Sequence, residues 1–261
     1  MRRLWKYLLK YLIVLALIAI VAWAIKGAEV SIVNIVTGVP NILDYLGRMV
    51  PPSGSILTKL GQPLTETFQI AIMAIIFATI VALPLSFLAA RNIMPNGVIY
   101  QTTRSILGIL RGIPPLLYAL LFVSMVGLGP FAGVLALTCH VVGGMGRFFS
   151  EAVENINPEV IDAAKAAGAN KVKTVIHAII PELGALILGY ILYFFEYNVR
   201  TGTILGLVGA GGIGLQLMIS IHLFKYGEVA TIMLVIVAVI VVMDRLSVIA
   251  RNRLIRGGVM V

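Results

Sequence analysis

The stretch NPEVIDAAKAAGANKVKTVIHAIIP, residues 157–181, organises the interpretation of this chain, because it is polar and helix-forming and lies between two long apolar runs. Asn157 is a favourable N-cap, Pro158 suits the first helical position, and Glu159 places a negative charge at the positive end of the helix dipole. The alanines that follow favour a helix without side-chain bulk, and Gly168 supplies a left-handed stop. We therefore predict a helix of about 10 residues, about 15 Å long.

A second helix is predicted directly after this glycine. Asn170 is its expected N-cap, Lys171 and Lys173 lie in its first turn, and the sequence becomes apolar from Val175 onward. The pattern is a short polar helix, a glycine, and a second helix that enters an apolar environment. This pattern predicts an exposed hairpin that docks onto a partner.

The composition identifies the apolar environment. Hydrophobic residues make up 60% of the 261 residues and charged residues only 12%, with a mean hydropathy of +1.03. Because soluble proteins average about 25% charged residues, an all-α membrane protein embedded in a lipid bilayer is predicted. The net charge of +9 does not indicate a nucleic-acid partner, since the basic residues flank the apolar runs. A single cysteine, Cys139, excludes an intrachain disulfide.

Six apolar runs predict six membrane spans, the third of them short. They cover residues 11–25, 65–90, 114–126, 131–149, 175–199 and 229–242. The first run ends in Ala22-Trp23-Ala24, which resembles a signal-peptide cleavage site, so a cleaved signal peptide is the alternative to a first span. The basic stretch 91–112 is interpreted as a polar return between the second and third spans.

Two domains follow from this layout. Residues 1–63 form an N-terminal span and an external segment, in which residues 30–49 are predicted to be an amphipathic helix on the membrane surface. Residues 64–261 form the transmembrane domain, with the hairpin loop at about 151–181.

The distribution of positive charge predicts the orientation. Of the 20 Lys and Arg residues, 15 lie on the side that carries both termini and the hairpin, and 5 lie on the other side. Because cytoplasmic loops carry an excess of Lys and Arg, both termini and the hairpin are predicted to be cytoplasmic. We expect a multi-pass protein of the bacterial cytoplasmic (inner) membrane.

The hairpin resembles the Glu-Ala-Ala motif of the membrane subunits of binding-protein-dependent ABC importers. Asp162-Ala163-Ala164, Gly168 and Pro181 occupy the motif positions in register, with Asp162 in place of the usual glutamate. Within that superfamily the chain most resembles the phosphonate-type permeases over about residues 65–246. Four blocks carry this resemblance: VGLGPFAGVLAL at 126–137, SEAVE at 150–154, GANK at 168–171 and FEYNVRTGTILGLVGAGGIG at 195–214.

The resemblance implies a type I ABC importer permease, which is a transport subunit without catalytic residues or a bound cofactor. The hairpin is then the coupling helix of the ATPase interface, and the residues expected to serve it are Glu159, Asp162, Ala163, Ala164, Gly168 and Pro181. The cargo is expected to be a phosphonate, phosphite or phosphate. Permeases for another small solute, and secondary transporters that need no ATPase, are the alternatives.

The expected partners follow from what the chain does not carry. It contains no G-x-x-x-x-G-K-[ST] motif, so ATP is expected to bind to a partner subunit. Six spans without an internal repeat favour a two-fold homodimer with the path on its axis. The expected assembly has two copies of this chain, two cytoplasmic ABC ATPase subunits and an extracytoplasmic substrate-binding protein.

Residues 196–214 are the candidate translocation path or gate. Glu196 and Arg200 are spaced to form a pair near the outer end of the fifth span, and Asn198 and Thr201 are nearby hydrogen-bonding groups. Arg200 is the candidate for meeting an anionic cargo, and a purely structural pair is the alternative. The glycines expected to line the path are Gly209, Gly211, Gly212 and Gly214. They match G-x-G-x-x-G, but without alternating strands and helices a re-entrant segment or close packing is favoured over dinucleotide binding.

Two further polar features are interpreted as structural. Arg147 and Glu151 have the spacing of a helical pair at the inner end of the fourth span. His140 has no carboxylate or second histidine at ligand spacing, so a packed polar residue is favoured over a metal ligand. No metal site is predicted.

Overall fold

The computed structural model describes residues 2–28 and 31–258, and the regular elements in this part of the chain are all helical. The chain divides into two compact units, residues 1–51 and 52–261. The first unit contains α1 (Arg2–Gly27) and α2 (Ile32–Arg48). α1 is apolar and exposed from residue 10 onward, as expected of a span. α2 is the helix predicted over residues 30–49, and Ser31 caps it by accepting a hydrogen bond from the Val33 amide. Its place on the membrane surface stays a prediction.

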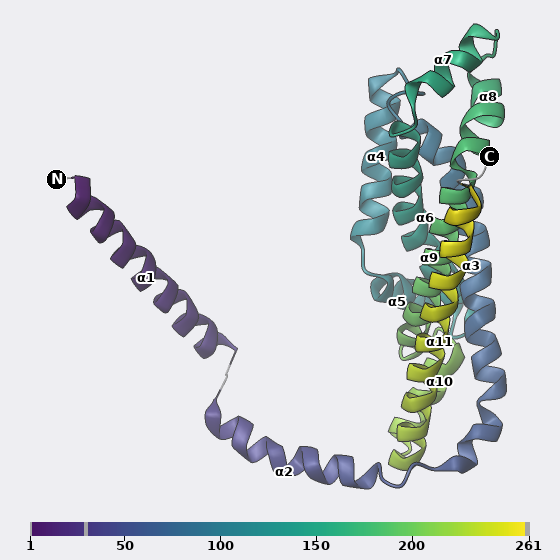
Figure 1. The fold of residues 1–261 in the computed structure, drawn as a ribbon. Coiled ribbons are helices and arrows are strands. Elements are labelled where there is room, and N and C mark those ends of the chain that lie inside the picture. Colours follow the sequence, from purple (N-terminus) through teal and green to yellow (C-terminus); the bar gives the residue numbers. More distant parts are fainter. Residues whose placement is uncertain (1, 29–30, 259–261) are drawn as a thin grey trace. The chain divides into compact units, whose positions relative to one another are not determined.

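The second unit is a bundle of long helices with a short helical hairpin at one end (Figure 1). Its elements are η1 (Gly54–Lys59), α3 (Gly61–Leu88), α4 (Gly97–Gly112), α5 (Pro115–Val126), α6 (Pro130–Glu154), α7 (Pro158–Ala166), α8 (Lys171–Thr174), the π-helical turn η2 (Val175–Ile179), α9 (Ile180–Gly206), α10 (Gly212–His222) and α11 (Tyr226–Gly258). α6 is central, since α3, α4, α5 and α9 all pack against it. Its side chains Val141, Met145 and Phe149 lie in the core with Leu107 of α4.

The segment that precedes α3 belongs to this second unit. Ile56 and Leu60 are 3% and 2% exposed and pack with Ile213 of α10 and Ile232 of α11. The sequence pattern groups residues 52–63 with the N-terminal segment instead. The structure differs because the apolar side chains of this short helix have a buried partner surface far along the sequence.

Among the residues that the structure describes, five helices are long and apolar enough to cross a membrane, and a sixth span arises if α4 and α5 are counted together. The described residues thus contain five or six candidate spans, which agrees with the prediction of about six. The prediction of a polar return over residues 91–112 is wrong, because most of this stretch is the helix α4, which packs along α6. α4 and α5 meet at a bend of 85°. Arg104 and Arg111 made this run look polar, whereas Thr103 and Leu107, one turn apart, are buried.

The bend between α4 and α5 is completed by side chains from other positions. Pro114 has no amide hydrogen, so the Leu110 carbonyl lacks its helical donor. The Tyr118 hydroxyl donates to that carbonyl at 3.1 Å. The Nδ1 atom of His140 lies 3.1 Å from the Ile113 carbonyl. Since these two side chains supply the missing donors, the bend is a built feature of the fold.

Candidate functional site: a coupling hairpin and a polar centre

α7 forms as its sequence predicts. The Asn157 side chain accepts a hydrogen bond from the Glu159 amide at 3.0 Å, and Pro158 is the first helical residue. Lys165 pairs with Asp162 at 3.2 Å on the exposed surface. None of the residues of α7 is buried, so its outer face is open to a partner.

The turn after α7 depends on Gly168, whose φ is +80°. The Gly168 amide donates to the Lys165 carbonyl at 2.9 Å, and the Ala169 amide donates to the Ala164 carbonyl at 3.0 Å. These bonds satisfy the last carbonyls of α7 and reverse the chain. Asn170 then caps α8 by accepting from the Lys173 amide at 2.9 Å. Both predicted caps and the predicted stop are therefore confirmed.

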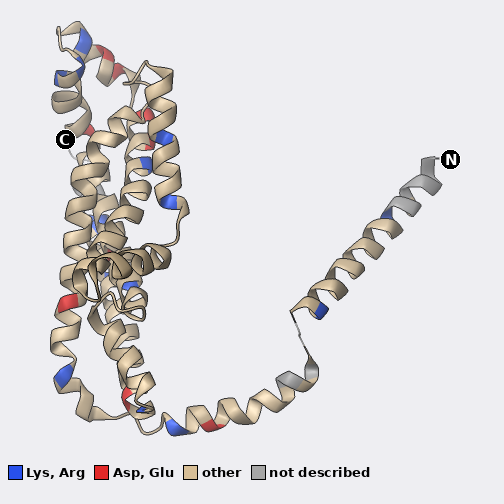
Figure 2. Cartoon of the chain, turned by 180° about the vertical axis from the view of Figure 1, so that it is seen from behind, with Lys and Arg blue, Asp and Glu red and all other residues tan. Residues whose placement is uncertain are grey.

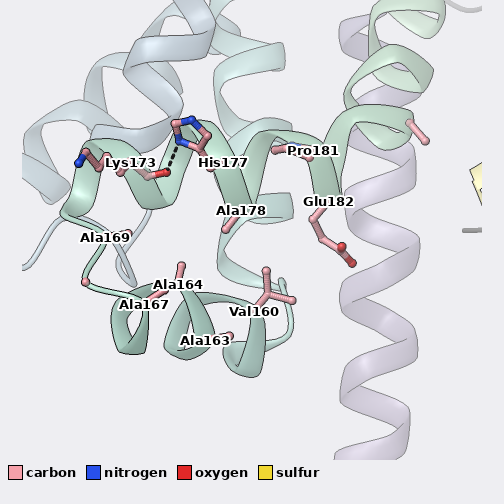
Figure 3. Close-up of a pocket in the computed structure, with 12 residues that line it drawn as sticks. Val160, Ala163, Ala164, Ala167, Ala169, Lys173, His177, Ala178, Pro181 and Glu182 are labelled. Atoms are coloured by element: carbon pink, nitrogen blue, oxygen red, sulfur yellow. Dashed lines mark hydrogen bonds between the residues drawn. The ribbon is translucent and has the colours of Figure 1, made fainter.

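A groove of about 1130 Å³ separates α7 from the start of α9 (Figure 3). On the α7 side it is lined by small side chains, including Ala163 and Ala164, and on the other side by His177, Pro181 and Glu182. Because the lining is small and the groove is open, side chains or backbone of another protein can approach closely here. The structure thus brings Ala163, Ala164, Gly168 and Pro181 together around one concavity.

An ion network fixes the bundle end beside the hairpin, where charged residues gather in Figure 2. Arg147 and Glu151 pair at 2.8 Å, which confirms the predicted helical pair. Arg104 reaches across from α4 to Glu154 of α6 at 3.2 Å. Sequence spacing did not indicate this second pair, since its partners are 50 residues apart.

In the candidate path, Glu196 and Arg200 pair at 3.0 Å as predicted. Arg251 of α11 lies 3.9 Å from the other oxygen of the same carboxylate. The Glu196 side chain is only 11% exposed, whereas that of Arg200 is 51% exposed. Glu196 therefore lies between two guanidinium groups and offsets part of the charge of each. Its contact with Arg251, from the stretch counted on the cytoplasmic side, does not fit the predicted place of Glu196 near the outer end of its span.

Asn198 and Thr201 lie on other faces of α9. Asn198 is fully buried, and its amide nitrogen is 3.5 Å from the Ala71 carbonyl of α3. Its side-chain oxygen has no partner among the described residues. Thr201 lies one helical turn after Tyr197 and is partly buried. The structure thus does not place Asn198 beside the exposed guanidinium of Arg200.

The glycine-rich segment is a tightly packed turn between α9 and α10. Gly209, Gly211 and Gly212 have φ values of +90°, +83° and +71°. The carboxylate of Glu66 accepts a hydrogen bond from the Gly212 amide at 2.9 Å, and the Thr67 hydroxyl accepts one from the Ile213 amide at 2.9 Å. α3 therefore caps α10. No sequence signal pointed to this capping by two α3 side chains, because the partners lie 146 residues away.

A polar centre that the sequence did not reveal lies beside the bend of α4 and α5. The His140 ring donates through Nδ1 to the Ile113 carbonyl, and its Nε2 atom lies 3.1 Å from the Tyr197 hydroxyl. Arg111 lies nearby in the last turn of α4. His140 is thus the packed polar residue that its isolation predicts, and it connects α6 with α9 and with the end of α4.

Comparison with known proteins identifies the family of this chain. Residues 82–256 match the family described as binding-protein-dependent transport system inner membrane component. The chain is 35% identical to the phosphite transport system permease protein PtxC of Stutzerimonas stutzeri, over 95% of this chain and 90% of that protein. It is 36% identical to the phosphate-import permease protein PhnE of Mycolicibacterium smegmatis, over 80% of this chain and 39% of that protein.

The fold has a counterpart among solved structures. An inward-facing structure of the MetNI methionine ABC transporter superposes with a TM-score of 0.69 at 23% identity, covering 79% of this chain and 99% of that chain. This likeness supports the predicted type I ABC importer permease fold, and the matched relatives confirm the resemblance to phosphonate-type permeases. The chain belongs to the binding-protein-dependent transport system inner membrane component family.

Proposed function

We propose that this permease carries a small phosphorus oxyanion, such as phosphite, a phosphonate or phosphate, into the cytoplasm with energy from a partner ATPase. The observation that carries the proposal is the exposed hairpin of α7, closed by Gly168 at positive φ, at one end of a multi-span bundle. Relatives named for phosphite and phosphate transport support the choice of cargo. In the proposed assembly, two copies form a homodimer with two ATPase subunits and an external binding protein. ATP-driven closure of the ATPase pair draws the two hairpins together.

Uptake into vesicles that hold the whole complex tests this function. The complex should accumulate labelled phosphite, methylphosphonate or phosphate only when ATP and the binding protein are both present. Labelled methionine and choline serve as control solutes. Accumulation of any of these anions without ATP would favour a secondary transporter, and accumulation of a control solute instead would replace the proposed cargo.

The orientation of the bundle gives a separate prediction. In a Cys139→Ala background, Lys165→Cys should react with a membrane-impermeant thiol reagent only in inside-out vesicles, because the hairpin is proposed to be cytoplasmic. Lys225→Cys is the matched control at the other end of the bundle, and it should react only in intact cells. The two lysine side chains are similarly exposed, at 63% and 52%. Reaction of Lys165→Cys from outside intact cells would reverse the orientation.

The proposed role of Arg200 predicts a moderate transport defect. Arg200→Gln should lower uptake about three- to tenfold, a loss of about 0.7–1.4 kcal/mol, because Glu196 already offsets part of its charge. The complex should still assemble, since Glu196 keeps Arg251 as a partner. Arg48→Gln is the matched control, because it breaks an exposed pair of the same spacing in α2. Unchanged uptake at normal protein level would make Arg200 a structural residue.

A further inference from the structure

Arg111 lies at the middle of the bundle without a carboxylate partner. Its backbone nitrogen packs on Gly143, where a Cβ would lie only 2.5 Å away, and Gly143 is near the centre of α6 (Pro130–Glu154). The residue is exposed. Within the described part of the chain, no ion pair includes its guanidinium.

Four other arginines of the bundle form ion pairs. Arg104 and Arg147 face Glu154 and Glu151, and Arg200 and Arg251 share Glu196. Arg111 thus differs from them in having its charge free at a depth where the surrounding helices are apolar. An unpaired cation facing lipid at this depth is unfavourable, so its exposed side is expected to face water or an anion.

A chain of polar side chains lies beside Arg111. Arg111 lies two residues before Ile113, whose carbonyl accepts a hydrogen bond from His140 Nδ1, and the other ring nitrogen of His140 lies 3.1 Å from the Tyr197 hydroxyl. His140 and Tyr197 are each only partly buried. α4, α6 and α9 therefore each contribute one polar residue, Arg111, His140 and Tyr197, close to the bend of an otherwise apolar bundle.

We propose that Arg111 is the cationic contact of an oxyanion subsite at the α4–α5 bend, with the Tyr197 hydroxyl as a polar group beside it. This proposal rests on the proposed function and names the place where the transported anion binds. The guanidinium offers several donors to the oxygens of a phosphite, phosphonate or phosphate. His140 is a positioning residue, because it ties the bend to Tyr197. The helix break between α4 and α5 gives the anion access to this depth, as broken helices do in other transporters.

Transport by Arg111 variants of the whole complex tests the subsite. Arg111→Gln should raise the KM for uptake of labelled methylphosphonate or phosphite at least tenfold, while co-purification with the ATPase and ATP hydrolysis without substrate stay at wild-type levels. Arg111→Lys should retain part of the affinity, since it keeps the charge and loses the planar fork. Arg245→Gln is the matched control, because Arg245 is also exposed and has no ion pair among the described residues. A wild-type KM in Arg111→Gln overturns the proposal.

A measurement on the wild-type complex keeps the proposal testable if Arg111→Gln fails to fold. Phenylglyoxal modifies water-accessible arginines, and peptide mass spectrometry reads the modification at each site. Arg111 should be modified, and saturating methylphosphonate or phosphite should slow its modification at least fivefold without affecting Arg245. Absence of modification, or modification that neither anion slows, overturns the subsite. If the wild-type complex transports none of the phosphorus oxyanions, the proposed function fails instead, so the two failures are distinguishable.

Discussion

Gly168→Val is expected to abolish most uptake while leaving the membrane bundle folded. Gly168 has a φ of +80°, and a Cβ added there would meet nothing within 4 Å, so the penalty comes from backbone conformation alone. A side chain in this conformation costs about 1–2 kcal/mol, and more for a β-branched residue. Relieving that strain turns α7 relative to α8 and displaces the groove beside Ala163 and Ala164. We expect uptake and ATPase co-purification to fall at least tenfold.

Two further variants test whether the backbone conformation at residue 168 causes the loss. Gly168→Asn should retain more activity than Gly168→Val, because asparagine tolerates the left-handed region. Gly97→Val is the matched control, since it adds the same side chain in open space at an ordinary φ. Wild-type coupling in Gly168→Val would mean that the hairpin is an ordinary cytoplasmic loop.

Gly214→Ala is expected to destabilise the bundle itself. A Cβ at this position would overlap the backbone carbonyl of Thr203 and lie 2.9 Å from the Cα of Gly206. Both obstacles are backbone atoms of α9, so a side-chain rotation does not relieve them. Overpacking of this kind costs about 1–3 kcal/mol. We expect a lower unfolding temperature of the detergent-purified protein and a reduced yield of the assembled complex.

Gly202→Ala provides the control for Gly214→Ala. Gly202 lies in the last turns of α9, the helix that Gly214 packs against, but its Cβ would meet only side-chain atoms at 3.9 Å, which is ordinary contact. The unfolding temperature of this variant should match that of the wild type. Equal stability of Gly214→Ala and Gly202→Ala would show that α10 can move away from α9, and the turn would then be a loose connection.

The sequence predicted the hairpin closely because local rules determine it. The capping of α7 by Asn157, the stop at Gly168 and the capping of α8 by Asn170 each involve residues within a few positions of one another. Helix capping and left-handed glycine are properties of short segments, so a single sequence is enough to predict them. The pair of Glu196 and Arg200 was predictable for the same reason.

What the sequence determined by itself was therefore the membrane class, the approximate number of spans, the hairpin and the neighbouring helical pairs. Only the tertiary structure decided that Arg111 lies beside a helix bend in the bundle, that His140 joins Ile113 to Tyr197, and that Glu66 caps α10. Each of these contacts joins helices that are distant in the sequence, and helix periodicity sets which residues share a face but not which helix covers that face. The sequence suggested a polar return around Arg111, because hydropathy alone does not distinguish an arginine in a cytoplasmic loop from an arginine beside a broken span.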